Sequence, residues 1–331
     1  MYPFTMLFKP AQDVSVAPMM AYTDRHFRML ARLASPSVRL FTEMITTGAL
    51  LHGDAQRALA YSDEEHPIAV QLGGNDAKHL ARSARLAEQA GFDEINLNVG
   101  CPSSRVQEGG IGACLMAQPH LVADCVRAMQ DAVSIPVTVK CRLGIDQQTT
   151  DEFLDTFIGT VAAGGCSRFY LHARIALLSG LSPAQNRSVP PLQYDRVRAL
   201  KIRWPNLQII LNGGLDELTA IEDALSWSDG VMIGRAAYHA PMLLAEIHRT
   251  WVDDQHRATA TEVADAYQQY MRREAAQGTP ASRMTRHALG LFNGQPGAKR
   301  YRQVLSNASL IKDHGVDVLS VALEQISRRA A

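Results

Sequence analysis

The stretch Asn96-Leu97-Asn98-Val99-Gly100-Cys101-Pro102 reads as the end of a buried strand followed by a tight turn. Side chains alternate between the two faces of a strand, so the two asparagines share one face and the two apolar residues share the other. Two amides on an inward face need hydrogen-bonding partners, and a bound ligand is one possible partner. The glycine and the proline favour a turn that carries Cys101. Cys101 is therefore either a buried structural cysteine or a reactive thiol at the end of the strand.

Short apolar runs alternate with helix-like segments through the first 240 residues. We expect strands at 14–17, 38–43, 68–72, 94–99, 137–143, 169–172, 207–211 and 230–233. Strict alternation of strand and helix favours a parallel sheet, and eight such units favour closure into a (β/α)8 TIM barrel. The lack of a G-x-G-x-x-G motif after the first strand counts against a dinucleotide-binding open sheet.

The pattern changes near Pro241, where strand-like runs stop and helical periodicity continues to the end. Further helices are expected at 242–251, 261–276, 282–292, 299–308 and 316–328. The sequence therefore predicts an α/β chain with a catalytic TIM-barrel domain over residues 1–240 and an all-helical domain over residues 241–331.

The composition is that of a soluble globular enzyme. The chain has 331 residues, is 47% hydrophobic and carries no formal net charge. Its apolar runs are too short to span a bilayer, and residues 1–12 lack the order of a signal peptide. The five cysteines include no C-x-x-C pair, which argues against a disulfide framework or a zinc site. We expect a cytoplasmic protein with no metal, no membrane contact and no stable protein partner.

The fifth predicted strand brings two cations to the carboxyl end of the barrel, where TIM barrels carry their chemistry. Thr138, Lys140 and Arg142 share one face of this strand, and apolar residues share the other. Because the apolar face must cover the surrounding helices, Lys140 and Arg142 should point into the barrel mouth. A buried cation without a partner is costly, so an anionic or electron-rich ligand is implied. The alternative is a structural ion pair with Glu43.

The last two strands end in segments typical of a phosphate site. Asn212-Gly213-Gly214 lets backbone amides approach a ligand closely, and Gly234-Arg235 adds a guanidinium at the start of a helix. Loops after strands seven and eight commonly bind phosphate in TIM barrels.

Two segments carry basic residues without acidic ones. They are the loop 174–187 and the stretch 275–312, which contains Arg283, Arg286, Lys299, Arg300, Arg302 and Lys312. Such clustering suits contact with a phosphate backbone, although a solvated helix face would also explain it.

Taken together, these motifs resemble those of the tRNA-dihydrouridine synthases, and most closely their A subfamily. The resemblance rests on the segments 17–19, 23–25, 42–44, 71–73, 96–102, 112–116, 139–142, 172–174, 186–192, 212–214, 234–235, 286–287 and 290–302. Two segments depart from it. Many relatives have Asp-Trp at Ala21-Tyr22, and a basic residue and a Trp at Ile175 and Leu177, all on the substrate side.

This resemblance implies an enzyme that uses FMN and NADPH to reduce uridines, at positions 20 and 20a of the tRNA D-loop, to dihydrouridine. Hydride would pass from reduced FMN to C6 of an extruded uracil, and Cys101 would protonate C5. The implied FMN contacts are Ala17, Pro18, Met19, Gln71, Lys140, His172, Asn212, Gly213, Gly214, Gly234 and Arg235. The implied RNA contacts are Asn98, Arg174, Arg187, Lys299, Arg300 and Arg302.

Two other functions fit part of the sequence. In a Schiff-base aldolase, Lys140 would be the nucleophile on a barrel strand. That assignment explains the phosphate-type loops but neither Cys101 nor the basic tail. A non-catalytic RNA-binding barrel would explain the tail alone.

Overall fold

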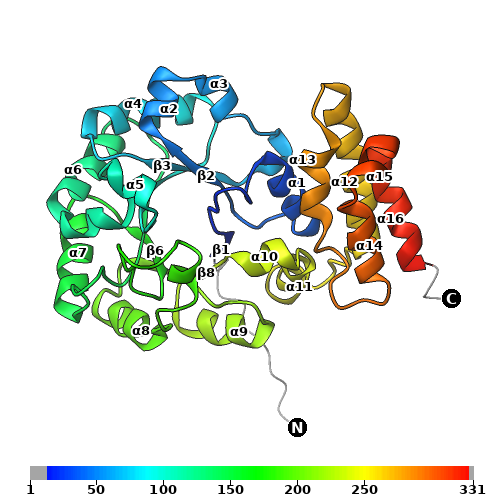
Figure 1. Cartoon of the computed structure of the whole chain (residues 1–331). Coiled ribbons are helices and arrows are strands. Elements are labelled where there is room, and N and C mark those ends of the chain that lie inside the picture. Colours follow the sequence, from blue (N-terminus) through cyan, green and yellow to red (C-terminus); the bar gives the residue numbers. More distant parts are fainter. Residues whose placement is uncertain (1–12, 328–331) are drawn as a thin grey trace, which may run out of the picture.

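The computed structural model describes residues 13–327, and at its centre eight parallel strands form a barrel (Figure 1). The strands are β1 (Asp13–Val16), β2 (Leu40–Thr46), β3 (Ile68–Gly73), β4 (Glu94–Val99), β5 (Val137–Cys141), β6 (Arg168–His172), β7 (Gln208–Asn212) and β8 (Gly230–Ile233). Their order is β1-β8-β7-β6-β5-β4-β3-β2. The barrel closes between β1 and β2, where the Val16 N–H donates to the Arg39 carbonyl and the Arg39 N–H donates to the Val14 carbonyl, both at 2.9 Å. The predicted TIM barrel is confirmed.

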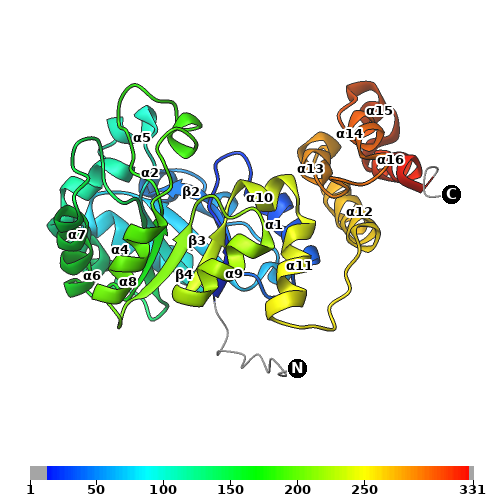
Figure 2. The same cartoon turned by 90° about the horizontal axis from the view of Figure 1, so that it is seen from below.

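Helices that follow the strands in the sequence surround the barrel (Figures 1 and 2). They are α1 (Arg25–Ala34), α2 (Thr47–His52), α3 (Ala55–Ala58), α4 (Ala77–Gln89), α5 (Ser104–Glu108), α6 (Pro119–Gln130), α7 (Asp151–Ala163), α8 (Tyr194–Arg203), α9 (Leu218–Trp227), α10 (Arg235–His239) and α11 (Met242–Trp251). Side-chain oxygens of Asp24, Asp76 and Thr150 accept backbone N–H groups at the starts of α1, α4 and α7. The outward residues of β4, such as Leu97, are fully buried in the core between the sheet and these helices.

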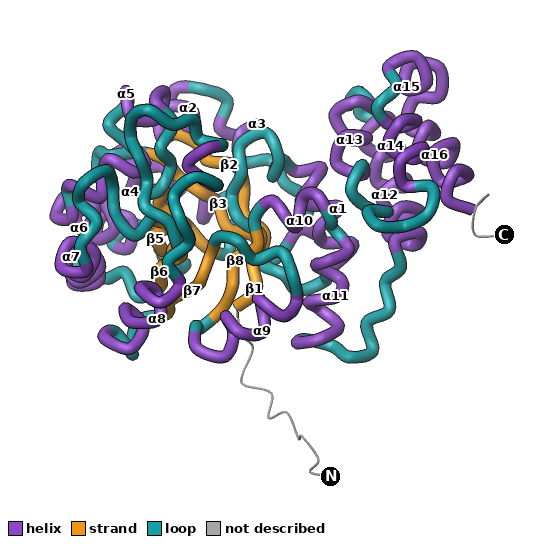
Figure 3. Tube along the Cα trace, turned by 60° about the horizontal axis from the view of Figure 1, so that its bottom comes forward, coloured by secondary structure: helices purple, strands orange, loops and turns teal. Residues whose placement is uncertain are grey.

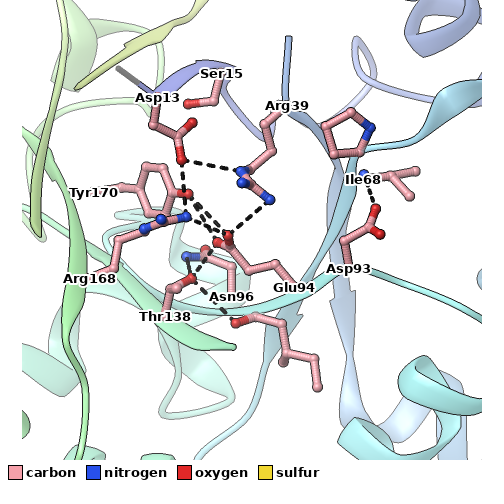
Figure 4. Close-up of polar contacts among 12 residues, drawn as sticks. Asp13, Ser15, Arg39, Ile68, Asp93, Glu94, Asn96, Thr138, Arg168 and Tyr170 are labelled. Atoms are coloured by element: carbon pink, nitrogen blue, oxygen red, sulfur yellow. Dashed lines mark hydrogen bonds and ion pairs between the residues drawn. The ribbon is translucent and has the colours of Figure 1, made fainter. Parts of the chain in front are cut away.

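Inside the barrel the side chains change from charged to apolar to polar along the strands. Asp13, Arg39, Glu94 and Arg168 form a network of ion pairs at the amino-terminal end, the barrel floor (Figure 4). A small apolar cluster fills the layer above the floor. Its members are Ala17, Phe41, Ala69, Tyr170, Ile210 and Met232. The carboxyl ends of the strands, which we call the mouth, carry the polar side chains described below.

Five further helices form a separate group beyond the barrel (Figures 2 and 3). They are α12 (Ala260–Ala276), α13 (Ala281–Ala288), α14 (Ala298–Leu305), α15 (Ala308–His314) and α16 (Val318–Ser327). Within residues 13–327, the helices of this group that pack most closely against α1 of the barrel are α12 and α13. The sequence-based division at 240/241 assigns α11 to the helical domain, yet α11 packs against α1, α9 and α10. Residues 252–259 then lead from α11 to α12 (Figure 3).

Some helix limits expected from sequence are wrong. The helix expected at 282–292 ends at Ala288, because the Gly290 backbone lies against His239, where an added Cβ would come within 2.3 Å of the carbonyl oxygen. The helix expected at 299–308 ends at Leu305, since Asn307 caps the separate helix α15. The last expected helix begins at Val318, and its expected end at 328 lies outside the described residues.

Candidate active site

The Asn-x-Asn-x-Gly-Cys-Pro segment places a thiol at the barrel mouth. At the end of β4 the Asn98 side chain turns back on its own chain, and its Oδ1 accepts the backbone N–H groups of Gly100 at 3.1 Å and Cys101 at 3.0 Å. Gly112, in the glycine loop that follows, has φ +82° and lies so close that a Cβ would come within 2.5 Å of the Cys101 carbonyl oxygen. This turn holds Cys101 half-exposed, unlike the buried Cys125, Cys141 and Cys166.

Lys140 lies on β5 next to Asn98 on β4, and its Nζ donates to Asn212 Oδ1 at 2.9 Å. Part of the side chain remains accessible to solvent, but the ammonium lies deep in the mouth. Burial, helped by the positive charge of Arg142, lowers the pKa of Lys140 to about 7. A negatively charged ligand would therefore be favoured beside it. Residues 13–327 contain no ion pair between Lys140 and Glu43, the structural alternative considered from sequence.

Arg142 also points inward, but backbone carbonyls satisfy its guanidinium. It donates to Gly100 O at 3.2 Å, Ile175 O at 3.2 Å and Asn186 O at 2.9 Å. Burial lowers the pKa of Arg142 to about 10. Arg142 thus joins the Cys101 turn to the long loop after β6, and the electron-rich partner expected for this cation is the protein backbone.

His172, at the end of β6, is a buried imidazole with an unused nitrogen. Its Nδ1 is buried and has no hydrogen-bonding partner among the described residues. Burial, together with the charges of Arg142 and Lys140, holds the pKa of His172 well below its ordinary value, so the ring is neutral. A buried polar atom without a partner is unusual in a folded protein, and a ligand in the mouth would satisfy it.

The ends of β7 and β8 form a glycine-lined edge beside His172. Asn212 is fixed from both sides, because its Nδ2 donates to Met232 O at 2.7 Å while its Oδ1 accepts from Lys140. Gly213 and Gly214 have φ of +110° and +70°, which glycine adopts without strain. A Cβ on Gly213 would contact His172 Cε1 at 3.4 Å.

At the end of β8, Gly234 borders open space, since a Cβ there would meet nothing within 4 Å. Arg235 is exposed at the start of α10, and its guanidinium donates to the Arg187 carbonyl at 3.1 Å. The two glycine segments predicted as a phosphate site therefore lie next to each other in space, since β7 pairs with β8.

The β1 and β3 strands complete the mouth. Ala17 belongs to the inner apolar cluster, and the half-buried Met19 packs against that cluster. The Met19 N–H donates to Thr23 Oγ1 at 2.9 Å, which turns the chain after the half-exposed Pro18. Gln71 is buried on β3, where its Oε1 accepts from Asn98 Nδ2 at 2.8 Å.

Comparison with known proteins gives the family of the chain. A family profile described as dihydrouridine synthase (Dus) matches residues 15–330. The chain belongs to the dihydrouridine synthase family. It is 51% identical over 96% of both chains to a tRNA-dihydrouridine(20/20a) synthase from Escherichia coli O6:H1. It is also 51% identical, with the same coverage, to the protein of that name from Salmonella typhimurium, and 53% identical to that from Pseudomonas syringae pv. tomato over 88% of this chain and 87% of the relative.

Family membership decides between the functions considered from sequence. A dihydrouridine synthase is an enzyme and an oxidoreductase, which excludes both the Schiff-base aldolase and the non-catalytic RNA-binding barrel. In residues 13–327 of this dihydrouridine synthase, no group of three His, Cys, Asp or Glu side chains could hold a metal ion. No helix in the same range is long and apolar enough to cross a membrane.

The RNA contacts expected from the resemblance fall in two places on this dihydrouridine synthase. Asn98, Arg174 and Arg187 lie at the mouth, where burial lowers the pKa of both guanidinium groups. Arg174 donates to Pro190 O at 2.6 Å, whereas the buried Nε of Arg187 has no partner among the described atoms. The three remaining residues lie apart from the mouth, exposed on α14 in the helical group (Figure 1). They are Lys299, Arg300 and Arg302.

Two further side chains shape the dihydrouridine synthase mouth, and the sequence did not assign them a role. Thr42 accepts the Gln71 backbone N–H at 3.0 Å, and Asn186, fully buried in the loop after β6, accepts the Leu177 N–H at 2.8 Å. Both residues belong to sequence motifs, the segments 42–44 and 186–192. Their hydrogen-bonding partners lie on other elements, so the alternation of side chains along a strand could not assign them.

Proposed function

We propose that this enzyme reduces uridines 20 and 20a in the tRNA D-loop to 5,6-dihydrouridine, with FMN as cofactor and NADPH as reductant. The supporting observation is the mouth itself, where a half-exposed thiol lies on the same rim as a lysine with a buried ammonium and a glycine-lined edge. The relatives that are about half identical to this chain carry the name tRNA-dihydrouridine(20/20a) synthase. A tRNA substrate also implies a cytoplasmic enzyme.

The residues of the mouth fit FMN. Gly213, Gly214 and Gly234 leave room for a phosphate to approach the backbone, and Arg235 supplies a guanidinium beside them. The unpaired Nδ1 of His172 offers a hydrogen bond to the cofactor. These five residues, with Asn212, would hold the phosphate and the ribityl chain.

The isoalloxazine ring would lie between β1, β3 and β5. Ala17, Pro18 and Met19 would pack against it, and Gln71 would hydrogen-bond its polar edge. Lys140 would stand at the N1 and O2 edge, where reduction builds negative charge. When bound and reduced by NADPH, FMN supplies the hydride that is transferred to C6 of the uracil.

Cys101 would supply the proton in this proposal. As hydride reaches C6, the Sγ–H bond of Cys101 breaks, a C5–H bond forms, and the sulfur is left as a thiolate. Lys140 and Arg142 both lie close enough to Cys101 to interact electrostatically with that thiolate. Asn98 would contact the uracil, and Arg174 and Arg187 the flanking phosphates. The base must leave the RNA stack to reach this position.

The helical part of the chain would bind the tRNA body. Lys299, Arg300 and Arg302 present three positive charges on one exposed helix, and folded RNA is bound largely by shape and phosphate contact. We retain the division into a barrel, residues 1–240, and a helical tRNA-binding domain, residues 241–331. In this proposal α11 is the first helix of the helical domain and packs against α1, α9 and α10 of the barrel, and the linker 252–259 leads from it to the remaining helices.

The direct test is to purify the protein, record its absorption spectrum and incubate it with NADPH and unmodified tRNA. A flavin spectrum and dihydrouridine mapped to positions 20 and 20a are the expected results. A colourless protein that neither binds added FMN nor forms dihydrouridine would contradict the proposal. Dihydrouridine at other positions would contradict the assigned substrate sites alone.

A further inference from the structure

A chain of hydrogen bonds begins at the barrel floor with Glu94. The Thr138 hydroxyl donates to Glu94 Oε1 at 2.7 Å, and Asn96 Nδ2 donates to Thr138 Oγ1 at 2.9 Å. Asn96 Oδ1 accepts from Gln71 Nε2 at 2.8 Å. Figure 4 shows Glu94, Thr138 and Asn96 close together, joined by dashed lines. This chain of hydrogen bonds thus runs from β4 to Thr138 on β5, returns to Asn96 on β4 and continues to Gln71 on β3.

The same chain continues from Gln71 to the catalytic turn. Gln71 Oε1 accepts from Asn98 Nδ2 at 2.8 Å, and Asn98 Oδ1 accepts the N–H groups of Gly100 and Cys101. We call the five side chains of this chain the relay. They are Glu94, Thr138, Asn96, Gln71 and Asn98, and each is at most 9% exposed.

Every donor in the relay points toward the floor, and the chemistry of its two ends requires this direction. A carboxylate can only accept, and Glu94 also accepts from Tyr170 at 3.0 Å. Burial raises the pKa of Glu94, but ion pairs with Arg168 at 3.2 Å and Arg39 at 3.5 Å oppose that rise and favour the carboxylate. At the other end, backbone N–H groups can only donate, so Asn98 must present its oxygen to Gly100 and Cys101. The two ends independently impose the same orientation on the amides between them.

A relay broken at Thr138 would keep this constraint only at its Cys101 end, so the amides between would be held from one side instead of two. Without the Thr138 hydroxyl, the Asn96 amide loses the acceptor for its NH2 group and can rotate by half a turn. The Gln71 amide could then rotate with it and present its NH2 group to Asn98. Asn98 would then have to rotate as well. Its NH2 group would face the N–H of Cys101, which places two donors against each other.

We propose that Thr138 and Asn96 are positioning residues, which hold Gln71 and Asn98 in a single amide orientation and thereby fix the turn that carries Cys101. The catalytic consequence rests on the proposed function, because Gln71 and Asn98 are its flavin and uridine contacts. The effect on the Cys101 turn does not depend on either ligand.

The test measures how fast iodoacetamide alkylates Cys101 in the full chain as purified, by mass spectrometry of the Cys101 peptide. Thr138→Val keeps the side-chain shape but removes the hydroxyl, and we expect alkylation to accelerate roughly fivefold as the turn loosens. Thr138→Ser restores the hydroxyl and should return the rate to within about twofold of wild type. Ser15→Ala removes another buried barrel hydroxyl, one that donates to the Val231 carbonyl and is not part of the relay, and should leave the rate unchanged.

A double-variant cycle separates a relay from general loosening of the barrel. Thr138→Val and Gln71→Leu interrupt the same chain at two points, so the double variant should be alkylated no faster than the faster single variant. Rates that multiply in the double variant would overturn the relay. Should Thr138→Val fail to fold, Asn96→Leu interrupts the chain at the next residue and takes its place.

Activity gives the second readout. Thr138→Val should lower the rate of dihydrouridine formation at saturating tRNA by at least roughly tenfold, with KM for tRNA within about twofold of wild type. Unchanged alkylation in folded Thr138→Val and Asn96→Leu would overturn the relay, whatever their activity. Accelerated alkylation in a protein that never forms dihydrouridine would support the relay and contradict the proposed function.

Discussion

Arg286 on α13 donates to the Asp24 carboxylate at 2.6 Å, although the two residues are 262 positions apart. The same carboxylate caps α1 by accepting the His26 and Phe27 N–H groups, and it also lies 3.0 Å from His287 Nε2. One side chain therefore starts a barrel helix and joins that helix to the helical group. Asp24 should be a principal link between the two parts of the chain.

Asp24 links stability to acidic pH. Burial alone would raise the pKa of Asp24, but hydrogen bonding and charge from His287, with Arg286, hold it well below its ordinary value. As the pH falls below about 4, Asp24 therefore stays deprotonated in the folded protein but takes up a proton in the unfolded chain. The contribution of Asp24 to stability is lost over this acidic range. Asp24→Asn, which can still cap α1, should lower the free energy of unfolding at pH 7 by about 1–3 kcal/mol.

Urea denaturation of Asp24→Asn between pH 2.5 and 7 checks this expectation. The variant should lose less stability than wild type over the acidic part of that range. Asp76→Asn is the matched control, because Asp76 caps α4 at a fully exposed site without contacting the helical group. Equal effects of the two substitutions would contradict a linking role for Asp24.

Lys140 should make the unliganded protein less stable at low pH. Its pKa is about 7 when folded and 10.5 ordinarily, so between these values the unfolded chain holds a proton that the folded protein has lost. The free energy of unfolding then rises with pH across that window. Lys140→Met removes the buried ammonium and should be more stable than wild type at pH 6, by an amount on the order of 1–3 kcal/mol.

The difference between wild type and Lys140→Met should shrink toward pH 10, which chemical denaturation at several pH values would measure. Lys78→Met, at an exposed position of α4, is the control and should change little at any pH. A Lys140→Met protein less stable than wild type at pH 6 would mean that the ammonium is satisfied without a ligand.

The α14 cations should contribute to tRNA affinity through phosphate contact. Replacing Lys299, Arg300 and Arg302 by Gln should weaken binding and reduce the slope of log K against log salt by roughly 2, because fewer counterions are released. Filter binding between 50 and 300 mM salt would measure this. The control replaces Arg82, Arg85 and Arg127, exposed on α4 and α6, which should leave the slope unchanged. Equal slopes for both triple variants would contradict the assignment.

Gly213 should be required for cofactor binding. Its φ of +110° strains any other residue, and a Cβ would press on Leu192 at 3.2 Å and on His172. Gly213→Ala should weaken FMN binding at least roughly tenfold, as measured by quenching of flavin fluorescence. Gly180→Ala carries a similar positive φ of +78° in open space and should bind FMN normally.

Local sequence periodicity was enough to predict the barrel and much of its mouth. Parity along β4 and β5 placed Asn98 and Lys140 on the inner face, and both lie there. The same reasoning could not find the partner of Lys140, because Asn212 is 72 positions away on β7. Pairs of this kind depend on which strands become neighbours across the closed barrel. Local periodicity carries no information about that arrangement.

The helical group was predicted less well. Some of its helices are joined by very short segments, such as Ser306 and Asn307 between α14 and α15, that resemble ordinary surface positions in the sequence. The break at Gly290 depends on contact with His239, and the attachment to α1 depends on Asp24 and Arg286. Each is a tertiary contact between distant segments, so local pattern underestimates the number of helices and misplaces their ends.

The most direct test of the account is a single-turnover reaction of Cys101→Ala, with FMN bound and reduced by NADPH before unmodified tRNA is added. We predict that the variant binds FMN and oxidises NADPH within about twofold of wild type, yet forms dihydrouridine at least roughly 100-fold more slowly, because it lacks only the proton donor. Dihydrouridine formation at the wild-type rate, or loss of FMN from the variant, would contradict the role of Cys101 as the acid.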